Sequence, residues 1–324
     1  MTTHQDGYIR WLRSHIGHEL IYLVYAVAFV FDERGYLLVQ ERYDFDWLSV
    51  PGGAMEPHES IRDCVLRETY EETGIHCTIE RFIGAFSHPD FNLTYPNGDQ
   101  VQPWTAAFVC RATSEAIQVD GKEALQAAFR PIDEIFERLP RQYQQMLTSY
   151  REGIGFEPVY YKHPLKPYYP ILRAKVGAER IILPGGTAVI FNEAGEVLTV
   201  RDKERGLWDL PAGLADLGES TTGTVVREIQ EETGLIIEPV RILGLYTHPS
   251  FAHMEFSNGD KAHLVDLILE CRIVDDRTPH VDNDEIDGIQ FMSLEALAAQ
   301  AGLSAMRRQI IADLQHRQQA PFVR

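Results

Sequence analysis

The sequence predicts an α/β protein of two tandem domains, each with a mixed β-sheet and helices on its two faces. The chain of 324 residues suffices for two domains of about 150, each able to bury its own core. The first half recurs in the second at a displacement of 160 residues, a period that indicates globular domains and not a solenoid. In each half, strand patterns occur in hairpins with few helices between them, which favours a mixed sheet.

Individual residues show how far the duplication extends. The residues that return at this displacement include Phe31 as Phe191, Gly35 as Gly195 and Pro51 as Pro211. We therefore expect domain 1 at residues 1–152 and domain 2 at residues 171–324. Residues 153–170 are rich in proline and tyrosine, and this proline content excludes a regular helix or a central strand, so the segment is the expected linker.

Local patterns predict the elements of domain 1. The apolar residues 20–31 predict a buried strand, and a turn at Gly35 leads into the next strand at 36–40. Asn97-Gly98 suits a hairpin turn or a substrate-binding loop, and both interpretations stay open. The remaining expected elements are strands at 77–86, 104–110 and 129–132, and helices at 8–16, at 59–72, from Asp133 and at 141–150.

Composition limits the classes of partner. Hydrophobic residues make up 44% and charged residues 24% of the chain, which is typical of a soluble globular protein. The net charge of −18 argues against nucleic acid as a partner, because no general basic surface is available to displace counterions. A small phosphate-bearing ligand remains compatible with this charge if a metal and a few arginines meet it locally.

Cysteine usage and hydropathy indicate a location. The four cysteines have no C-x-x-C pair and no zinc spacing, so we interpret them as core residues in a reducing compartment. The first residues have no signal-peptide pattern, and the longest apolar run, 20–31, is too short to span a bilayer. We therefore expect a cytoplasmic protein with no membrane partner.

Each half contains a glycine-bearing loop followed by a helix with an acidic end. Glu68, Glu71 and Glu72 fall on the helix face that begins apolar, where an ordinary amphipathic helix would continue its apolar stripe. The second copy has Glu228, Glu231 and Glu232 at the same spacing. These like charges repel, and a cation would relieve the repulsion. Carboxylates without cysteine or histidine favour Mg²⁺, with Mn²⁺ as the alternative, over zinc.

A solvated acidic last turn is the other interpretation of each helix. The loops Pro51-Gly52-Gly53 and Pro211-Ala212-Gly213 count against it, because a tight turn before the helix can supply a backbone carbonyl as a further ligand. The full pattern is Gly53, Glu59, Arg67-Glu68, Glu71-Glu72 and Gly74-Ile75, then Gly213, Glu219, Arg227-Glu228, Glu231-Glu232 and Gly234-Leu235. Both copies resemble the Nudix box, with Thr69 in an apolar slot as the mildest departure, so the chain is similar to the Nudix hydrolase superfamily.

This resemblance implies an α/β/α sandwich in each domain, with the box forming a loop, helix, loop unit. It implies a Mg²⁺-dependent pyrophosphohydrolase that cleaves the diphosphate linkage of a nucleoside diphosphate joined to another group. The implied catalytic and metal-binding groups are the carboxylates of Glu68, Glu71, Glu72, Glu228, Glu231 and Glu232 and the carbonyls of Gly52 and Ala212. Which glutamate acts as the general base stays open.

Other charged residues are expected near these sites. The resemblance implies that Arg67 and Arg227 brace the two boxes by pairing with Glu59 and Glu219. Arg42 lies where a strand meets the box loop and could reach phosphate. Together with Arg67 and Arg227, it is a candidate ligand-binding residue.

Family members often draw a further glutamate from a later loop. Glu123 and Glu285 occupy comparable positions, each six residues before a phenylalanine, and are candidate catalytic residues. The alternative for each is a solvated loop acid.

The second box departs from the first at two positions. Ala212 replaces a glycine, which limits the backbone if it needs positive φ, and Gly223 should cost its helix about 1 kcal/mol relative to alanine. Neither change removes a carboxylate, so both sites are expected to bind metal. His88 and His248, before prolines at equivalent strand ends, are either packed or hydrogen-bonded histidines, or they have a base-stacking or substrate role.

Other functions fit parts of this pattern. One or both domains could bind a nucleotide-like ligand without turnover, as a regulatory or dimerisation module. A nucleotide-responsive transcription regulator would need an appended helix-turn-helix, whereas only a helix at 303–315 follows the second domain, and the acidic charge opposes it. Whether the domains pair with each other or form a homodimer, and which nucleotide-type substrate is cleaved, stay open.

Overall fold

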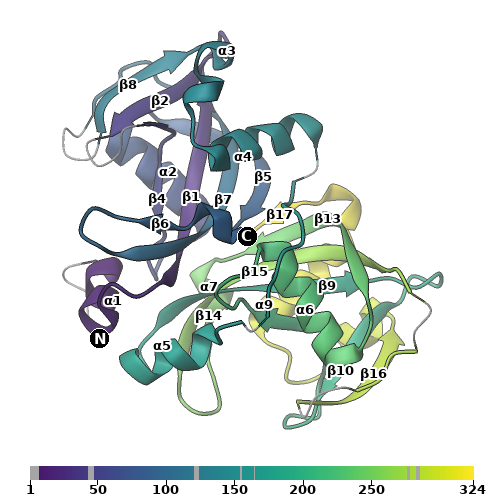
Figure 1. Ribbon diagram of the computed structural model, residues 1–324. Helices are drawn as coiled ribbons and strands as arrows, with labels where there is room; N and C mark the ends of the chain where they lie inside the picture. The colour runs from purple at the N-terminus through teal and green to yellow at the C-terminus, as the bar shows by residue number, and fades with distance from the viewer. Residues whose placement is uncertain are drawn as a thin grey trace. The chain divides into compact units, whose positions relative to one another are not determined.

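The computed structural model describes residues 7–42, 47–119, 124–153, 155–163, 165–275, 278–281 and 285–324. The chain divides into two compact units. Unit 1 comprises residues 1–157 and 174–176, and unit 2 comprises residues 158–173 and 177–324 (Figure 1).

Unit 1 is built on one mixed sheet. Its strands are β1 (Ile21–Phe31), β2 (Leu37–Arg42), β3 (Leu48–Ser49), β4 (Gly52–Ala54), β5 (Cys77–Phe86), β6 (Leu93–Thr94), β7 (Gln100–Ala112) and β8 (Ala124–Arg130). Its helices are α1 (Tyr8–Ile16), α2 (Ile61–Thr73), α3 (Ile132–Ile135) and α4 (Arg141–Glu152). The main strand order is β3-β2-β1-β7-β5. β1 and β7 run parallel, and antiparallel partners flank them on both sides.

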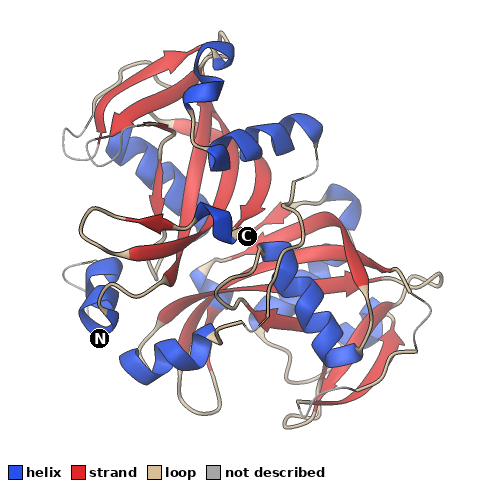
Figure 2. Cartoon of the chain, viewed as in Figure 1, coloured by secondary structure: helices blue, strands red, loops and turns tan. Residues whose placement is uncertain are grey.

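Helices cover both faces of this sheet (Figure 2). On one face, α2 packs against β1, β4 and β5. On the other, Val27 and Phe29 of β1 join a buried cluster with Met146 and Leu147 of α4. Successive residues of a strand point to opposite faces, so the single strand β1 supplies both cores.

Unit 2 repeats this architecture with two sheets. Its strands are β9 (Ile181–Ile190), β10 (Val197–Asp202), β11 (Trp208–Asp209), β12 (Ala212–Leu214), β13 (Ile237–Tyr246), β14 (His253–Glu255), β15 (Lys261–Ile273), β16 (Ile286–Met292) and β17 (Phe322–Val323). Its helices are α6 (Thr221–Thr233), α7 (Pro249–Ala252), α8 (Leu294–Ala298) and α9 (Ala305–Leu314), and α5 (Tyr168–Val176) precedes β9. The sheets have the orders β12-β9-β15-β13-β17 and β11-β10-β16, and β9 and β15 run parallel like β1 and β7.

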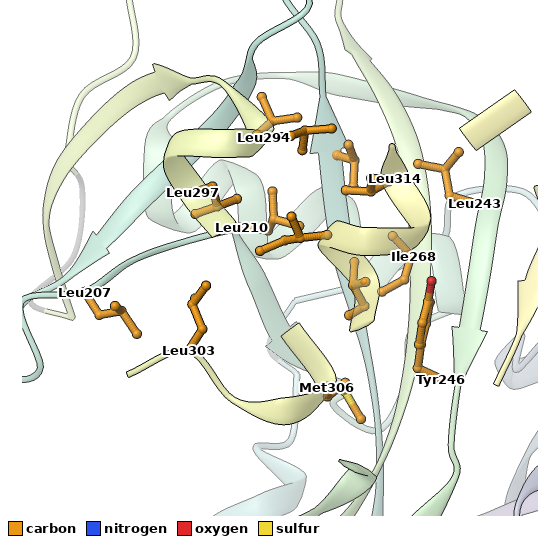
Figure 3. Close-up of a cluster of buried hydrophobic side chains, with 14 of the residues drawn as sticks. Leu207, Leu210, Leu243, Tyr246, Ile268, Leu294, Leu297, Leu303, Met306 and Leu314 are labelled. Carbon is orange, nitrogen blue, oxygen red and sulfur yellow. The ribbon is translucent and has the colours of Figure 1, made fainter. Parts of the chain in front are cut away.

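The C-terminal helix of unit 2 is held by an apolar cluster, shown in Figure 3. Met306 and Leu314 of α9 pack with Tyr246 of β13 and Ile268 of β15, and all four side chains are at most 3% exposed. Ser304 caps the start of α9 by accepting a hydrogen bond from the backbone of Arg307. This packing fixes the first turn of α9 against the sheet.

Most expected elements lie close to the observed ones, with two differences. The strand expected at 129–132 is β8, which begins at Ala124 because its pairing with β2 extends to Arg42, and residue 132 already belongs to α3. Residues 168–170, expected within the linker, form the first turn of α5, where Pro170 is tolerated because no intrahelical donor is needed there. Within the described ranges, no helix combines the length and apolar character that a membrane crossing requires.

Candidate active sites

The two acidic helices are delimited by their own sequences. Ser60 caps α2 by accepting a hydrogen bond from the backbone of Asp63, whose carboxylate accepts one from the backbone of Ser60 in return. Ser220 caps α6 in the same place. Each helix ends at a left-handed glycine, Gly74 with φ 70° and Gly234 with φ 69°. The acidic last turns therefore start and stop at equivalent positions.

The box glycines make room for a carboxylate. A Cβ atom on Gly53 would lie 2.3 to 2.5 Å from the carboxyl group of Glu68, and one on Gly213 would lie 1.8 to 2.3 Å from that of Glu228. Such distances exclude any side chain without a shift of the glutamate. In both units, the first glutamate of the acidic turn therefore packs directly on the backbone of the loop that precedes the helix.

Glu72 links the helix to the sheet in unit 1. Its side chain is 4% exposed, and its Oε2 accepts hydrogen bonds from Nε2 of Gln40, at 2.9 Å, and from the backbone N–H of Gly52, at 3.0 Å. Glu72 and Glu68 thus lie on the inner side of α2, whereas the Glu71 side chain is 57% exposed. The structure brings two of the three candidate carboxylates of unit 1 to the box loop.

An arginine joins the acidic groups of each box. In unit 1, Arg67 donates to Glu59 at 2.6 and 2.9 Å, to Glu68 at 2.7 Å and to Glu71 at 3.0 Å. These partners raise the pKa of Arg67 above its usual value, and the hydrogen bond to Glu59 has the largest effect. The Arg67 side chain is 30% exposed.

The corresponding arginine of unit 2 is more deeply buried. Arg227 is 6% exposed, and Glu219, to which it donates at 2.8 and 2.9 Å, is fully buried. Arg227 also lies 2.8 Å from Glu228 and 3.0 Å from Glu231. The Glu231 side chain, 48% exposed, corresponds to Glu71. Burial makes this network more sensitive to the loss of one partner.

Glu232 lacks the hydrogen-bond donor that Glu72 has in unit 1. β2 pairs Gln40 with Ser49, and the equivalent pair in unit 2 is Val200 with Asp209, so a valine replaces the glutamine. Glu232 is 8% exposed, and its buried Oε2 has no hydrogen-bond partner within the described part of the chain. Burial, together with the charges of Glu228 and Glu285, raises the pKa of Glu232 to about 8.

Charged residues surround Glu232 in unit 2. Arg307 of α9 contacts Asp209 of β11 at 2.6 Å and lies 4.0 Å from Asp266 of β15. Its Nη1 also donates to Oγ1 of Thr187 at 3.1 Å. Burial raises the pKa of Asp266, and the Arg307 charge opposes this rise. We call Thr187, Asp209, Asp266 and Arg307 the unit 2 charged cluster.

Unit 1 has neutral residues at the same positions. The strand registers align Thr105 with Asp266, Ser49 with Asp209 and Val27 with Thr187. From α4, Nε2 of Gln142 donates to Oγ1 of Thr105 at 3.2 Å, in the place where α9 presents Arg307 to Asp266. The two copies of the box therefore lie in different electrostatic environments.

The candidate residues outside the boxes have different outcomes. Glu285 is close enough to Glu232 for its charge to raise the pKa of that carboxyl group. Glu123 lies outside the described residues. The backbone of Arg42 pairs with Ala124 in the sheet, but its side chain also lies outside the described part of the structure.

The departures in the second box have structural reasons. Ala212 pairs with Thr187 as Gly52 pairs with Val27, and it has no positive φ, so alanine is unstrained. A Cβ atom on Gly223 would lie 2.1 Å from the carbonyl oxygen of Tyr160, which packs against the start of α6. Gly223 is therefore needed at this position despite its expected cost to the helix, because the Cβ atom of an alanine would clash with that carbonyl.

The two histidines serve as caps. Nδ1 of His88 accepts a hydrogen bond from the backbone of Asp90, and Nδ1 of His248 accepts one from the backbone of Ser250. These contacts start the short helical turns that follow each histidine. They favour the hydrogen-bonded interpretation over a contact to a substrate base.

A cleft of about 520 Å³ adjoins the box in unit 1. Glu68, Gly52 and Gly53 of the box line it, and so does Asn97 of the β6–β7 hairpin turn. The turn itself forms as expected, since Gly98 N–H donates to the Tyr95 carbonyl, so Asn97 belongs both to a hairpin turn and to the cleft. Clefts of this size bind small organic ligands.

Aromatic side chains form much of the cleft wall. Tyr25, Trp47, Tyr95 and Tyr143 all line it. The hydroxyl groups of Tyr25 and Tyr95 lie 3.0 Å apart, and burial raises the pKa of Tyr25. Trp47 is 37% exposed, whereas Tyr143 packs edge-on against Phe29 at a centroid distance of 6.3 Å. The cleft thus brings aromatic side chains together with the carboxylate of Glu68.

The acidic residues fit a hard divalent cation in part. Among the described residues, no three or more His, Cys, Asp or Glu side chains converge as a ready metal site, since Arg67 and Arg227 draw one glutamate of each box outward. The buried Oε2 of Glu232, without a partner among these residues, is an oxygen that a cation would satisfy. The oxygen-only donor set suits Mg²⁺ or Mn²⁺.

The raised pKa values predict how unit 2 responds to pH without metal. Burial raises the pKa of Glu228 to about 7 and that of Glu232 to about 8, from 4.5. The folded unit therefore binds protons that the unfolded chain releases. The contribution of these two groups to stability is complete below pH 4.5 and is lost as pH rises through 7 and 8. In EDTA, hydrogen exchange should show that the α6 amides open more often as pH rises from 6 to 9. The α2 amides serve as the reference.

The matched variant for this pH experiment is Glu232→Gln, which removes one titrating group while keeping its shape. Between the unfolded pKa of 4.5 and the folded pKa of about 8, it should reduce the pH dependence of the unfolding free energy by about 1.4 kcal/mol per pH unit. An unchanged slope in Glu232→Gln would assign the pH effect to other groups.

Several site residues were missed from the sequence. The unit 2 charged cluster and the aromatic cleft residues carry no motif, because they come from separate strands and helices. One signal was available: aligning the two copies puts Asp209 opposite Ser49 and Asp266 opposite Thr105, so acids appear in the second copy only. That alignment alone does not reveal Arg307, whose helix lies far along the chain.

The chain matches the family model described as NUDIX domain twice, at residues 22–151 and 183–314. An ADP-ribose pyrophosphatase of Methanocaldococcus jannaschii is 34% identical over 35% of this chain and 59% of its own length. An 8-oxo-dGDP phosphatase of Mus musculus is 37% identical over 25% of this chain and 24% of its own. A crystal structure of the MutT protein from Methanosarcina mazei is 26% identical, with a TM-score of 0.36, over 44% of this chain and 99% of its own. The chain thus spans less than two thirds of these curated relatives.

Proposed function

The chain belongs to the Nudix hydrolase family, and from this premise we propose that it is a Mg²⁺-dependent pyrophosphohydrolase that cleaves the diphosphate linkage of a nucleoside diphosphate joined to another group. The observation that carries this proposal is the cleft of unit 1, where Glu68 and the box loop meet aromatic walls. Relatives named for ADP-ribose and 8-oxo-dGDP support a substrate of this class. Four free cysteines favour a reducing, cytoplasmic location.

The residues of each box would hold the metal. In unit 1 we assign this role to Glu68, Glu71, Glu72 and the carbonyl of Gly52, and in unit 2 to Glu228, Glu231, Glu232 and the carbonyl of Ala212. A bound Mg²⁺ neutralises phosphate oxygens and lowers the pKa of water for attack on phosphorus. The glycines at 53 and 213 let the first glutamate of each turn lie against the loop, which supports its role as an inner ligand.

The chain's own groups orient the reaction. Arg67 and Arg227 hold their glutamates through ion pairs, and the Arg227 charge opposes the rise that burial causes in the pKa of Glu228. Gln40 and the backbone of Gly52 hold Glu72 toward the loop by donating to one of its oxygens. A carboxylate of the turn takes the proton from water, and Glu285 is the further acidic candidate in unit 2. A catalytic role for Glu123 stays a prediction. A phosphate contact by Arg42 also stays a prediction.

A hydrolysis screen tests the proposal. ADP-ribose, a nucleotide sugar, a dinucleoside polyphosphate and 8-oxo-dGDP would be incubated with the full chain and Mg²⁺, and products would be separated by anion-exchange chromatography. We expect cleavage within the phosphate chain of at least one compound and none with EDTA. Turnover that is equally fast in EDTA would contradict a metal-dependent hydrolase, and no turnover with Mg²⁺ or Mn²⁺ would favour a binding role.

A second assignment has support from unit 2: one unit is catalytic and the other binds a nucleotide-like ligand or has a regulatory or dimerisation role. The carboxyl groups of Glu228 and Glu232 have raised pKa values in unit 2, and charged residues replace neutral ones beside them. Such a site holds fewer ionised ligands at neutral pH until a cation binds. Single-box variants, described in the Discussion, separate these alternatives.

A further inference from the structure

The two units differ in the residues that correspond to the lining of the unit 1 cleft. In unit 1, Tyr25, Trp47 and Tyr95 line one cleft together with Glu68. This places three aromatic side chains in the same cavity as Glu68, a candidate ligand of the metal. An aromatic base stacks on such faces with a gain of roughly 1–3 kcal/mol per base.

The three rings come from different parts of the chain and line the same cleft. Tyr25 lies in the middle of β1, and its hydroxyl contacts that of Tyr95 at 3.0 Å, which fixes the β6–β7 hairpin turn against the sheet. Trp47 directly precedes β3 and is 37% exposed, so part of its surface is open to a ligand. The cleft therefore combines a rigid tyrosine pair with an accessible indole.

Unit 2 lacks two of these three rings. Tyr25 pairs with Thr105 in unit 1, and Gly185 pairs with Asp266 at the same register position in unit 2. Gly185 is therefore the counterpart of Tyr25. The strand pairings align Leu48 with Trp208, so the residue before each, Trp47 or Leu207, is also equivalent. Leu207 is 8% exposed and belongs to the apolar core. Only Tyr95 keeps an aromatic counterpart, Phe256, at the same place in its hairpin turn.

The unit 2 charged cluster adds a reason against base stacking. Asp209 and Asp266 replace Ser49 and Thr105, which line the unit 1 cleft, and Arg307 replaces Gln142. These groups are at most 19% exposed and already pair with one another. Placing an apolar ring against them would remove water from charged groups without replacing its hydrogen bonds, which is unfavourable.

We propose that base recognition is confined to unit 1, where Tyr25, Trp47 and Tyr95 select substrates that carry an aromatic base, and that unit 2 does not read the base. This inference rests on the proposed function for the position of the phosphates and names the substrate class of the unit 1 site. Trp47 and Tyr95 are its specificity-determining residues.

Calorimetric titration of the full chain tests the proposal. The probes are adenosine 5′-monophosphate and ribose 5-phosphate, each with Mg²⁺, because they share the phosphoribosyl part and differ in the base. We expect one base-dependent site per chain, with ribose 5-phosphate binding at least about tenfold more weakly. Trp47→Leu, which installs the unit 2 residue, and Tyr95→Leu should each weaken nucleotide binding roughly 5- to 150-fold and leave ribose 5-phosphate unchanged.

The matched control is Phe256→Leu, the counterpart of Tyr95→Leu in unit 2, which should alter neither probe. Thermal unfolding checks that the variants are folded, and the 37% exposure of Trp47 means that its replacement empties no core. Two equivalent nucleotide sites per chain would overturn the proposal. Equal losses for both probes, unchanged nucleotide affinity in Trp47→Leu and Tyr95→Leu, or no nucleotide binding at millimolar concentration would also overturn it.

The outcomes also separate this inference from the proposed function. Base-dependent binding at one site, without hydrolysis of any diphosphate in the screen, would remove the hydrolase assignment and leave base recognition in unit 1. Metal-dependent hydrolysis, with equal affinities for the two probes, would support the hydrolase assignment and remove base recognition in unit 1.

Discussion

The chain carrying both Glu72→Gln and Glu232→Gln is expected to hydrolyse its diphosphate substrate at least roughly a hundredfold more slowly than the parent chain. Glutamine keeps the shape of each side chain but removes the negative charge that would bind the metal or accept a proton. Glu72 is 4% exposed and Glu232 is 8% exposed. Because both side chains are buried, bulk water cannot take over the role of the lost carboxylate. Initial rates at saturating Mg²⁺, measured on the substrate found in the screen, give the comparison.

The single variants assign the activity to a unit. If Glu72→Gln alone abolishes turnover while Glu232→Gln keeps it, unit 1 is the hydrolase and unit 2 has another role. Glu80→Gln serves as the control, because Glu80 lies on β5, pairs with Arg111 and is 41% exposed. A double variant that turns over substrate at the parent rate would refute the role of both boxes.

Arg227→Ala is expected to destabilise unit 2 by about 3–5 kcal/mol, which is the cost of leaving a buried charge without its partner. Glu219 is fully buried and accepts two hydrogen bonds from Arg227, at 2.8 and 2.9 Å. Without the guanidinium group, Glu219 must either stay charged in a dry interior or take up a proton. Hydrogen exchange of the α6 amides measures the loss, with α2 in the same chain as the internal reference.

Arg67→Ala in unit 1 is the matched control for this prediction. Arg67 is 30% exposed and Glu59 is 14% exposed, so water can reach the group that remains, and we expect less than half of the destabilisation. Adding Glu219→Gln to Arg227→Ala should recover part of the lost stability, because no buried charge is then left. Equal losses for the two arginine variants would contradict the assigned difference in burial.

The sequence by itself determined the family, the acidic helices and most element boundaries. These features depend on local signals that act over a few residues: Ser60 caps α2, Gly74 ends it, and a continuous run of apolar residues defines β1. The duplication strengthened each of them, since the same signals recur in the second half. Local chemistry and repetition were therefore sufficient for the box.

Only the tertiary structure decided how the two sites differ. Tyr25 and Tyr95 meet across 70 positions of sequence, and Arg307 reaches Asp209 from the last long helix, so neither contact leaves a local pattern. Gly223 looked like a weak helix residue until the carbonyl of Tyr160 was found against it. Such contacts depend on which surfaces of distant elements pack together, and packing is a property of the whole folded chain.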